Sequence, residues 1–91
     1  MHQEERFSRD RLTNVDHGAV ASGVMRIVDA FQNERQEVQV ASSGILFHLV
    51  CERFGLSPRE THTIVGNILN HSAGRRKEYT AARNYMHHEW K

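Results

Sequence analysis

Apolar side chains recur along this chain at spacings of three and four residues, and no stretch shows the sustained alternation of apolar and polar positions typical of a strand. The first apolar stripe consists of Val20, Val24, Ile27 and Phe31. It predicts a helix from Asp16 to Phe31, with Thr13 or Asn14 as the N-cap residue. The pattern therefore favours an all-α chain from its first element onward.

A second predicted helix, Arg35–Phe54, has apolar side chains on two opposite sides. One face carries Val38, Ala41, Ile45 and Leu49. Because a helix with two apolar faces must be covered on both, it is either the central helix or part of a subunit interface. We therefore expect a homo-oligomer, with a dimer favoured. The residues expected to mediate self-association are Val40, Phe47, Val50 and Phe54.

Two further helices follow, and the first has a clear start signal. Ser57-Pro58-Arg59-Glu60 combines an N-cap serine, a proline at the first helical position and a glutamate three residues after the cap. Gly55 stands where a left-handed residue would end the preceding helix. After the break at residues 72–74, Arg76–Trp90 forms the last predicted helix. Its shared face consists of Tyr79, Ala82, Met86 and Trp90.

Four helices with short connections predict a compact four-helix bundle-like single domain over residues 13–91. Residues 1–12 are polar and are expected to form a loose N-terminal arm. The length of 91 residues allows one domain, and the small core would benefit from oligomerisation.

A helix–turn–helix unit is one interpretation of the region around Gly55. Phe54-Gly55-Leu56 lies between two predicted helices, where DNA-binding units place a glycine between hydrophobic residues. Arginine and asparagine can make paired hydrogen bonds to base edges. A recognition helix from Pro58 would expose Arg59, His62, Thr63, Asn67 and Asn70. A plain bundle corner would have the same local sequence.

The phrase Leu56-Ser57-Pro58-Arg59-Glu60 resembles the opening of the response-regulator type of helix–turn–helix domain. The resemblance covers these five residues. The downstream second turn and recognition helix of that family are not matched, so none of its binding residues is transferred to this chain.

Positive charge gathers at the C-terminal end, although the net charge of the whole chain is +1. Residues 71–91 have a net charge of +3, whereas residues 1–40 have a net charge of −2. Arginine also outnumbers lysine, and its planar guanidinium suits recognition of anionic groups. We expect a protein partner here, with nucleic acid as an alternative. The expected partner-binding residues are Arg75, Arg76, Lys77, Arg83 and His87.

Seven histidines and one cysteine raise the questions of metal binding and catalysis. No histidine pair has the spacing of a helical zinc motif, and the adjacent His87 and His88 point about 100° apart on a helix. The histidines instead suggest a pH-sensitive interface. Cys51 borders the Phe47 and Phe54 face, which favours a buried, inert thiol. We therefore expect no enzyme activity, no cofactor and no metal site.

The absence of an apolar leader or a long apolar run favours a cytoplasmic protein without a membrane segment. Small size, preference for arginine and the layout of Asn67–Trp90 resemble short all-helical accessory proteins of bacteriophages. That resemblance implies modulation of a host machine by direct binding, in the host cytoplasm. We expect a small non-enzymatic adaptor that self-associates, with a DNA-binding transcriptional regulator as the alternative.

Overall fold

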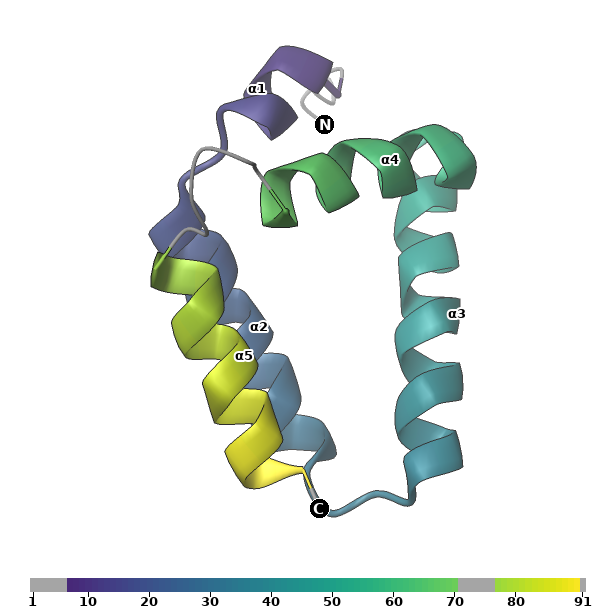
Figure 1. The fold of residues 1–91 in the computed structure, drawn as a ribbon. Coiled ribbons are helices and arrows are strands. Elements are labelled where there is room, and N and C mark those ends of the chain that lie inside the picture. The colour runs from purple at the N-terminus through teal and green to yellow at the C-terminus, as the bar shows by residue number, and fades with distance from the viewer. Residues whose placement is uncertain (1–6, 71–76, 91) are drawn as a thin grey trace, which may run out of the picture.

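The computed structural model describes residues 7–70 and 77–90, and every regular element in these two stretches is a helix. Figure 1 shows their order and arrangement. The helices are α1 (Arg9–Thr13), α2 (His17–Phe31), α3 (Gln36–Phe54), α4 (Pro58–Leu69) and α5 (Lys77–Glu89). The all-α prediction is confirmed. Within the described stretches, no helix combines the length and apolar character that crossing a membrane requires.

The start of α2 differs from the prediction, because Asp16 rather than Thr13 or Asn14 is its N-cap residue. Asp16 Oδ1 accepts hydrogen bonds from the backbone N–H groups of Gly18 and Ala19, at 3.0 and 3.2 Å. Thr13 and Asn14 instead belong to the end of α1, where their side chains donate to backbone carbonyls four residues earlier. Aspartate is as good an N-cap as asparagine, so local preference alone did not separate the candidates.

α1 lies partly within the segment expected to be a loose arm. Ser8 is its N-cap residue and accepts a hydrogen bond from the Arg11 N–H at 3.2 Å. A five-residue helix is too short to show an apolar stripe, so periodicity could not reveal it. One turn of helix is intrinsically marginal, and α1 therefore depends on its neighbours and its cap.

The corner between α3 and α4 follows the sequence prediction. Gly55 ends α3 in the left-handed conformation, with φ of 67°. Ser57 then caps α4 by accepting a hydrogen bond from the Glu60 N–H at 3.3 Å, and Pro58 occupies the first helical turn. The capping signal and the glycine together define a sharp corner.

Gly55 and Gly66 allow a matched test of this corner. No heavy atom lies within 4 Å of a Cβ built at either glycine, so substitution by alanine creates no clash. Gly55→Ala is expected to lower the free energy of unfolding by about 1–2 kcal/mol, because alanine is strained in the left-handed region. Gly66→Ala, inside α4, is expected to raise it by about 0.5–1 kcal/mol. Urea unfolding followed by circular dichroism measures both, and changes of equal sign would contradict the assignment.

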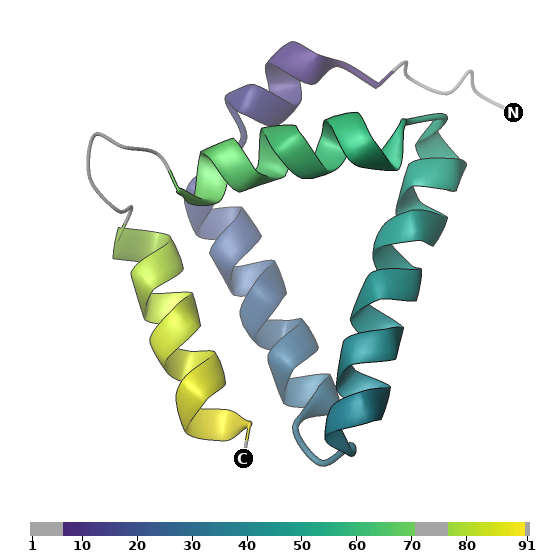
Figure 2. The same ribbon diagram turned by 45° about the vertical axis from the view of Figure 1, so that its right-hand side comes forward.

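α2 and α5 lie side by side and run in the same direction (Figures 1 and 2). Small side chains make their close packing possible. The core between them contains Ala21, Ala82 and Tyr79, with Val20, Val24, Met25 and Ile68 packed around it. Deeper along α2, Val28 is 1% exposed. This pair of helices contains most of the buried apolar surface of the described residues.

Hydrogen bonds between described residues join the two helices along their length. His17 Nδ1 and the Tyr79 hydroxyl are 2.6 Å apart near the two helix starts. The Tyr85 hydroxyl donates to the Asp29 carboxylate near the far end. Beyond α5, Trp90 Nε1 donates to the Val28 carbonyl oxygen at 3.0 Å. The pairing of α2 with α5 is therefore polar as well as apolar, and it fixes their register.

α3 runs in the opposite direction to α2, and α4 crosses between the end of α3 and the α2–α5 pair (Figure 2). The α2–α3 corner is held by Gln39, which is buried and donates to the Phe31 carbonyl oxygen at 2.9 Å. At the other end of α3, Cys51 is 1% exposed, near the contact with α4. Between these two points α3 presents most of its side chains to solvent, and the four-helix bundle stays a prediction.

Candidate functional site

α3 carries an unusual number of exposed large apolar side chains. The exposed fraction reaches 74% at Val40, 60% at Ile45 and 53% at Leu49. We call this set the α3 apolar surface: Val38, Val40, Ile45, Leu46, Leu49, Val50 and Phe54. Two of the nineteen residues of α3, Gln39 and Cys51, are buried. Single exposed hydrophobic residues are normal, but a helix exposed in this way marks an interaction surface.

The structure places the four expected self-association residues unevenly. Val40, Val50 and Phe54 are exposed, whereas Phe47 is half-buried. Phe54 also contacts Phe7, with ring centroids 6.3 Å apart. The opposite stripe of Val38, Ile45 and Leu49 is more open than the sequence suggested. A self-association surface on α3 therefore need not centre on Phe47.

The five candidate DNA-contacting residues are on one helix and all are exposed. They are Arg59, His62, Thr63, Asn67 and Asn70, the last being the C-cap residue of α4. Two of them have local bonds, because the Thr63 hydroxyl donates to the Arg59 carbonyl oxygen and Asn70 Nδ2 donates to the Gly66 carbonyl oxygen. Near the start of α4, Glu60 faces Arg9 of α1 at 3.8 Å. α4 thus presents polar side chains with little net positive charge.

The basic C-terminal candidates are divided between several environments. Arg75 and Arg76 lie outside the described residues. Lys77 and His87 are exposed on α5, whereas Arg83 is half-buried. Tyr79 of the same helix is buried against α2. Tyr85 and Trp90 are half-buried, and they donate hydrogen bonds to the Asp29 carboxylate and the Val28 carbonyl oxygen. These rings are therefore not a free platform on which bases could stack.

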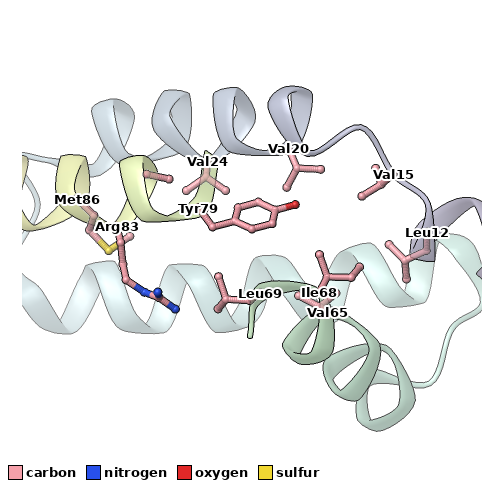
Figure 3. Close-up of a pocket in the computed structure, with 11 residues that line it drawn as sticks. Leu12, Val15, Val20, Val24, Val65, Ile68, Leu69, Tyr79, Arg83 and Met86 are labelled. Atoms are coloured by element: carbon pink, nitrogen blue, oxygen red, sulfur yellow. The ribbon is translucent and has the colours of Figure 1, made fainter. Parts of the chain in front are cut away.

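An apolar cavity of about 410 Å³ lies between α2, α4 and α5. Figure 3 shows side chains from all three helices directed toward this space. The residues of α1 and the following turn that reach it are Leu12 and Val15. Periodicity along the chain gives no sign of this cavity, because the cavity depends on how far α4 stands from the α2–α5 pair. Representative lining residues are Val20, Val24, Val65, Ile68, Tyr79 and Arg83.

Arg83 is the charged member of the cavity lining. Figure 3 shows its side chain extending from α5 between Met86 and Leu69, at the side of the cavity away from the Tyr79 hydroxyl. Among the described residues, no carboxylate forms an ion pair with Arg83. Arg83 was expected to be one of the partner-binding residues, and in the structure it lines an apolar space.

Tyr85 of α5 has a pKa well above the usual value for tyrosine. Its hydrogen bond to the Asp29 carboxylate, followed by burial and the charges of Asp29 and Glu89, raises the pKa of Tyr85 to about 12. The neutral phenol is the form that donates to Asp29. A folded pKa above the usual value of 10.0 means that this contribution to stability is complete below pH 10 and is lost as the pH rises through 12.

Removing the Asp29 carboxylate is expected to return the pKa of Tyr85 from about 12 toward 10. The measurement is a tyrosinate absorbance titration of the protein with and without Asp29→Ala, each compared with its Tyr85→Phe counterpart. The comparison isolates the titration of Tyr85 from that of Tyr79. Superimposable Tyr85 curves would show that the Asp29 contact does not exist in solution.

The histidine and cysteine side chains among the described residues are dispersed. Within the described stretches, no group of three or more His, Cys, Asp or Glu side chains could hold a metal ion. His48 is exposed and Cys51 is buried, although they are three residues apart on α3. His17 is paired with Tyr79 across the α2–α5 contact. The candidate sites that the described residues form are therefore the exposed surfaces of α3 and α4 and the cavity.

Comparison of the chain with protein-family models, with curated proteins and with solved structures finds no match. Function is therefore argued from the physical chemistry of the α3 apolar surface, the exposed side of α4 and the cavity.

Proposed function

We propose that this chain is a small non-enzymatic binding protein that self-associates through α3 and acts by contacting a protein partner. The observation that carries the proposal is the α3 apolar surface. Burial of apolar surface contributes about 25 cal/mol per Å², and this is the main driving force for association. Within the described part of the chain, α2 and α4 cover only the two ends of α3.

A second copy of this chain is the occupant that best fits the side of α3 that carries Ile45. Val38, Ser42, Ile45 and Leu49 follow the alternating spacing of three and four residues that forms a coiled-coil seam. Ile45 lies at the middle of the nineteen-residue helix. An antiparallel pair of α3 helices related by a two-fold axis would therefore place both copies of Ile45 near the axis. The four-helix packing expected from the sequence would then be completed between copies.

The test of self-association is sedimentation velocity of the wild type across micromolar concentrations. We expect a dimer, and Ile45→Glu is expected to weaken the dimer at least about a hundredfold, since a buried unpaired charge costs several kcal/mol. Gln36→Glu is the matched control, because it introduces the same charge at the first residue of the same helix. A wild type that stays monomeric would overturn the proposal.

Phe47→Glu separates the two sides of α3. If the dimer forms through the side of Val40, Phe47 and Phe54, this variant becomes monomeric while Ile45→Glu stays dimeric. Because Phe47 is half-buried, circular dichroism must first show that the Phe47→Glu variant keeps its helical content. The two variants therefore identify the interface as well as testing its existence.

The protein partner is proposed to bind the basic side of the C-terminal region. Its supporting features are the net charge of +3 over residues 71–91 and the exposure of Lys77 and His87. The resemblance to phage accessory proteins supports a role in modulating a host machine in the cytoplasm. A nuclease-treated pull-down with mass spectrometry is the test. Loss of the partner with Lys77→Glu and its retention with His62→Glu would support this surface, and recovery of DNA alone would overturn it.

DNA binding is the second candidate function, and it is favoured by the exposure of all five candidate side chains on α4. In Figure 2, α4 crosses the end of α3 at a steep angle, as in helix–turn–helix units. Fluorescence anisotropy with duplex DNA at several salt concentrations is the test. A DNA-binding protein should lose affinity steeply with salt, and Arg59→Gln should relax sequence preference. Absence of binding at low salt would remove this candidate.

A further inference from the structure

We propose that the cavity between α2, α4 and α5 binds a free medium-chain fatty acid, with the alkyl chain among the apolar side chains and the carboxylate on Arg83. This is a small-molecule site, and it is independent of self-association through α3. It follows from the volume of the cavity, the chemistry of its lining and the guanidinium of Arg83, which forms no ion pair with a described carboxylate.

The volume and lining favour an apolar ligand. About 410 Å³ falls within the range of roughly 300–1,000 Å³ that is usual for small-molecule sites. Ten of the eleven lining residues are apolar or aromatic, including Val20 and Val24 of α2 and Ile68 of α4. The lining offers water few hydrogen-bond partners, and its side chains lack the close dispersion contacts of a packed interior. An alkyl chain restores these contacts without requiring polar partners.

Arg83 sets the charge of the ligand. A guanidinium presents several N–H donors in one plane, and these match the two oxygens of a carboxylate. The described residues supply no competing carboxylate partner for it. Among the described residues of the lining, Arg83 is the one cationic side chain, and its single charge matches that of a carboxylate.

The polar groups elsewhere in the lining are already engaged. The Tyr79 hydroxyl is 2.6 Å from His17 Nδ1, so it is part of the α2–α5 contact. Its ring, which is buried, supplies apolar surface to the cavity. A ligand that entered with its carboxylate toward Tyr79 would have to break this pair. The geometry therefore points to one orientation, with the carboxylate at Arg83.

Isothermal titration calorimetry with decanoate below its micellar concentration tests the proposal. We expect saturable binding of one decanoate per chain, and binding of decanol or decyltrimethylammonium that is at least about tenfold weaker, as expected for a charge-assisted hydrogen bond. Equal affinity for decanoate and decyltrimethylammonium would overturn the role of Arg83, and absence of decanoate binding would overturn the site.

Arg83→Gln is expected to weaken decanoate binding by about ten- to a hundredfold while leaving decanol binding nearly unchanged. Arg26→Gln is the matched control. Arg26 is exposed on α2, donates to the Ser22 hydroxyl and does not line the cavity, so this variant has the same net charge and should bind decanoate normally. Equal weakening by both variants would show that the attraction is non-specific.

Amide chemical-shift changes locate the bound decanoate without depending on any variant. Shifts concentrated at Val20, Val24, Ile68 and Ala82 support the cavity. Shifts concentrated at Ile45 and Leu49 would place decanoate on the α3 apolar surface and overturn the proposal. A wild type whose cavity residues do not respond to decanoate would also overturn the proposal.

Discussion

Replacing Tyr79 with alanine is expected to lower the free energy of unfolding by about 3–5 kcal/mol, the usual range for truncating a buried aromatic residue. Tyr79 is the largest member of the α2–α5 core cluster, and its ring packs among Ala21, Ala82 and their neighbours. The loss combines the apolar area of the ring, the void that remains and the hydrogen bond to His17. Since small domains have about 5–15 kcal/mol of stability, this single change removes a large share of it.

Tyr79→Phe separates the ring from the hydroxyl. It keeps the apolar contacts and removes the partner of His17, so we expect a loss of about 1 kcal/mol. Thermal and urea unfolding followed by circular dichroism measure both variants. If Tyr79→Ala were no more destabilising than Tyr79→Phe, the α2–α5 interface described above would not be the core in solution.

Replacing Trp90 with alanine is expected to lower the free energy of unfolding by about 3 kcal/mol, at the lower end of the range for buried aromatic residues because Trp90 is half-buried. Its indole N–H donates to the Val28 carbonyl oxygen, and this bond connects the residue just beyond α5 to the most deeply buried part of α2. Loss of the side chain removes this bond, whereas the hydrogen bond from Tyr85 to Asp29 remains near that end of the helix pair.

Two companion variants make the Trp90 result specific. Trp90→Phe keeps much of the ring but lacks the donor, so we expect a loss of about 1 kcal/mol. His88→Ala changes an exposed residue of the same turn and should stay within about 0.5 kcal/mol of the wild type. Trp90 is the chain's one tryptophan, so circular dichroism rather than fluorescence must follow all three proteins. A Trp90→Ala protein as stable as His88→Ala would contradict the anchoring role.

Local signals in the sequence predicted the helices well. The glycine at 55 and the Ser57-Pro58-Arg59-Glu60 phrase act on neighbouring backbone groups, and the structure confirms both the left-handed cap and the capping bond. The prediction of which face of the last helix is buried was also correct for Tyr79 and Ala82. The predicted N-cap residue of α2 was wrong, because several good capping residues between Thr13 and Asp16 are close together in the sequence.

The arrangement of the helices could not be predicted in the same way. Periodicity shows that α3 has two apolar faces, but it does not show that α4 covers only one end of this helix. It also gives no sign that Gln39, a polar residue on α3, is buried at the corner by its bond to the Phe31 carbonyl oxygen. Packing distances between helices depend on contacts far apart in sequence, and the cavity arises at that level. Arg83 was selected for its charge, whereas its place beside the cavity comes from the packing.

The pairing of α2 with α5 has a consequence for how the chain is made. The Val28 carbonyl oxygen accepts a hydrogen bond from the Trp90 indole, and these two residues are 62 positions apart in the sequence. At a synthesis rate of about 5–20 residues per second, α2 would leave the ribosome roughly 3–12 s before its partner exists. Through that interval Val20, Val24 and Val28 have no α5 to cover them. The nascent chain must therefore rely on slow closure of a long loop, or on a temporary protector such as a chaperone, to reach its folded core intact.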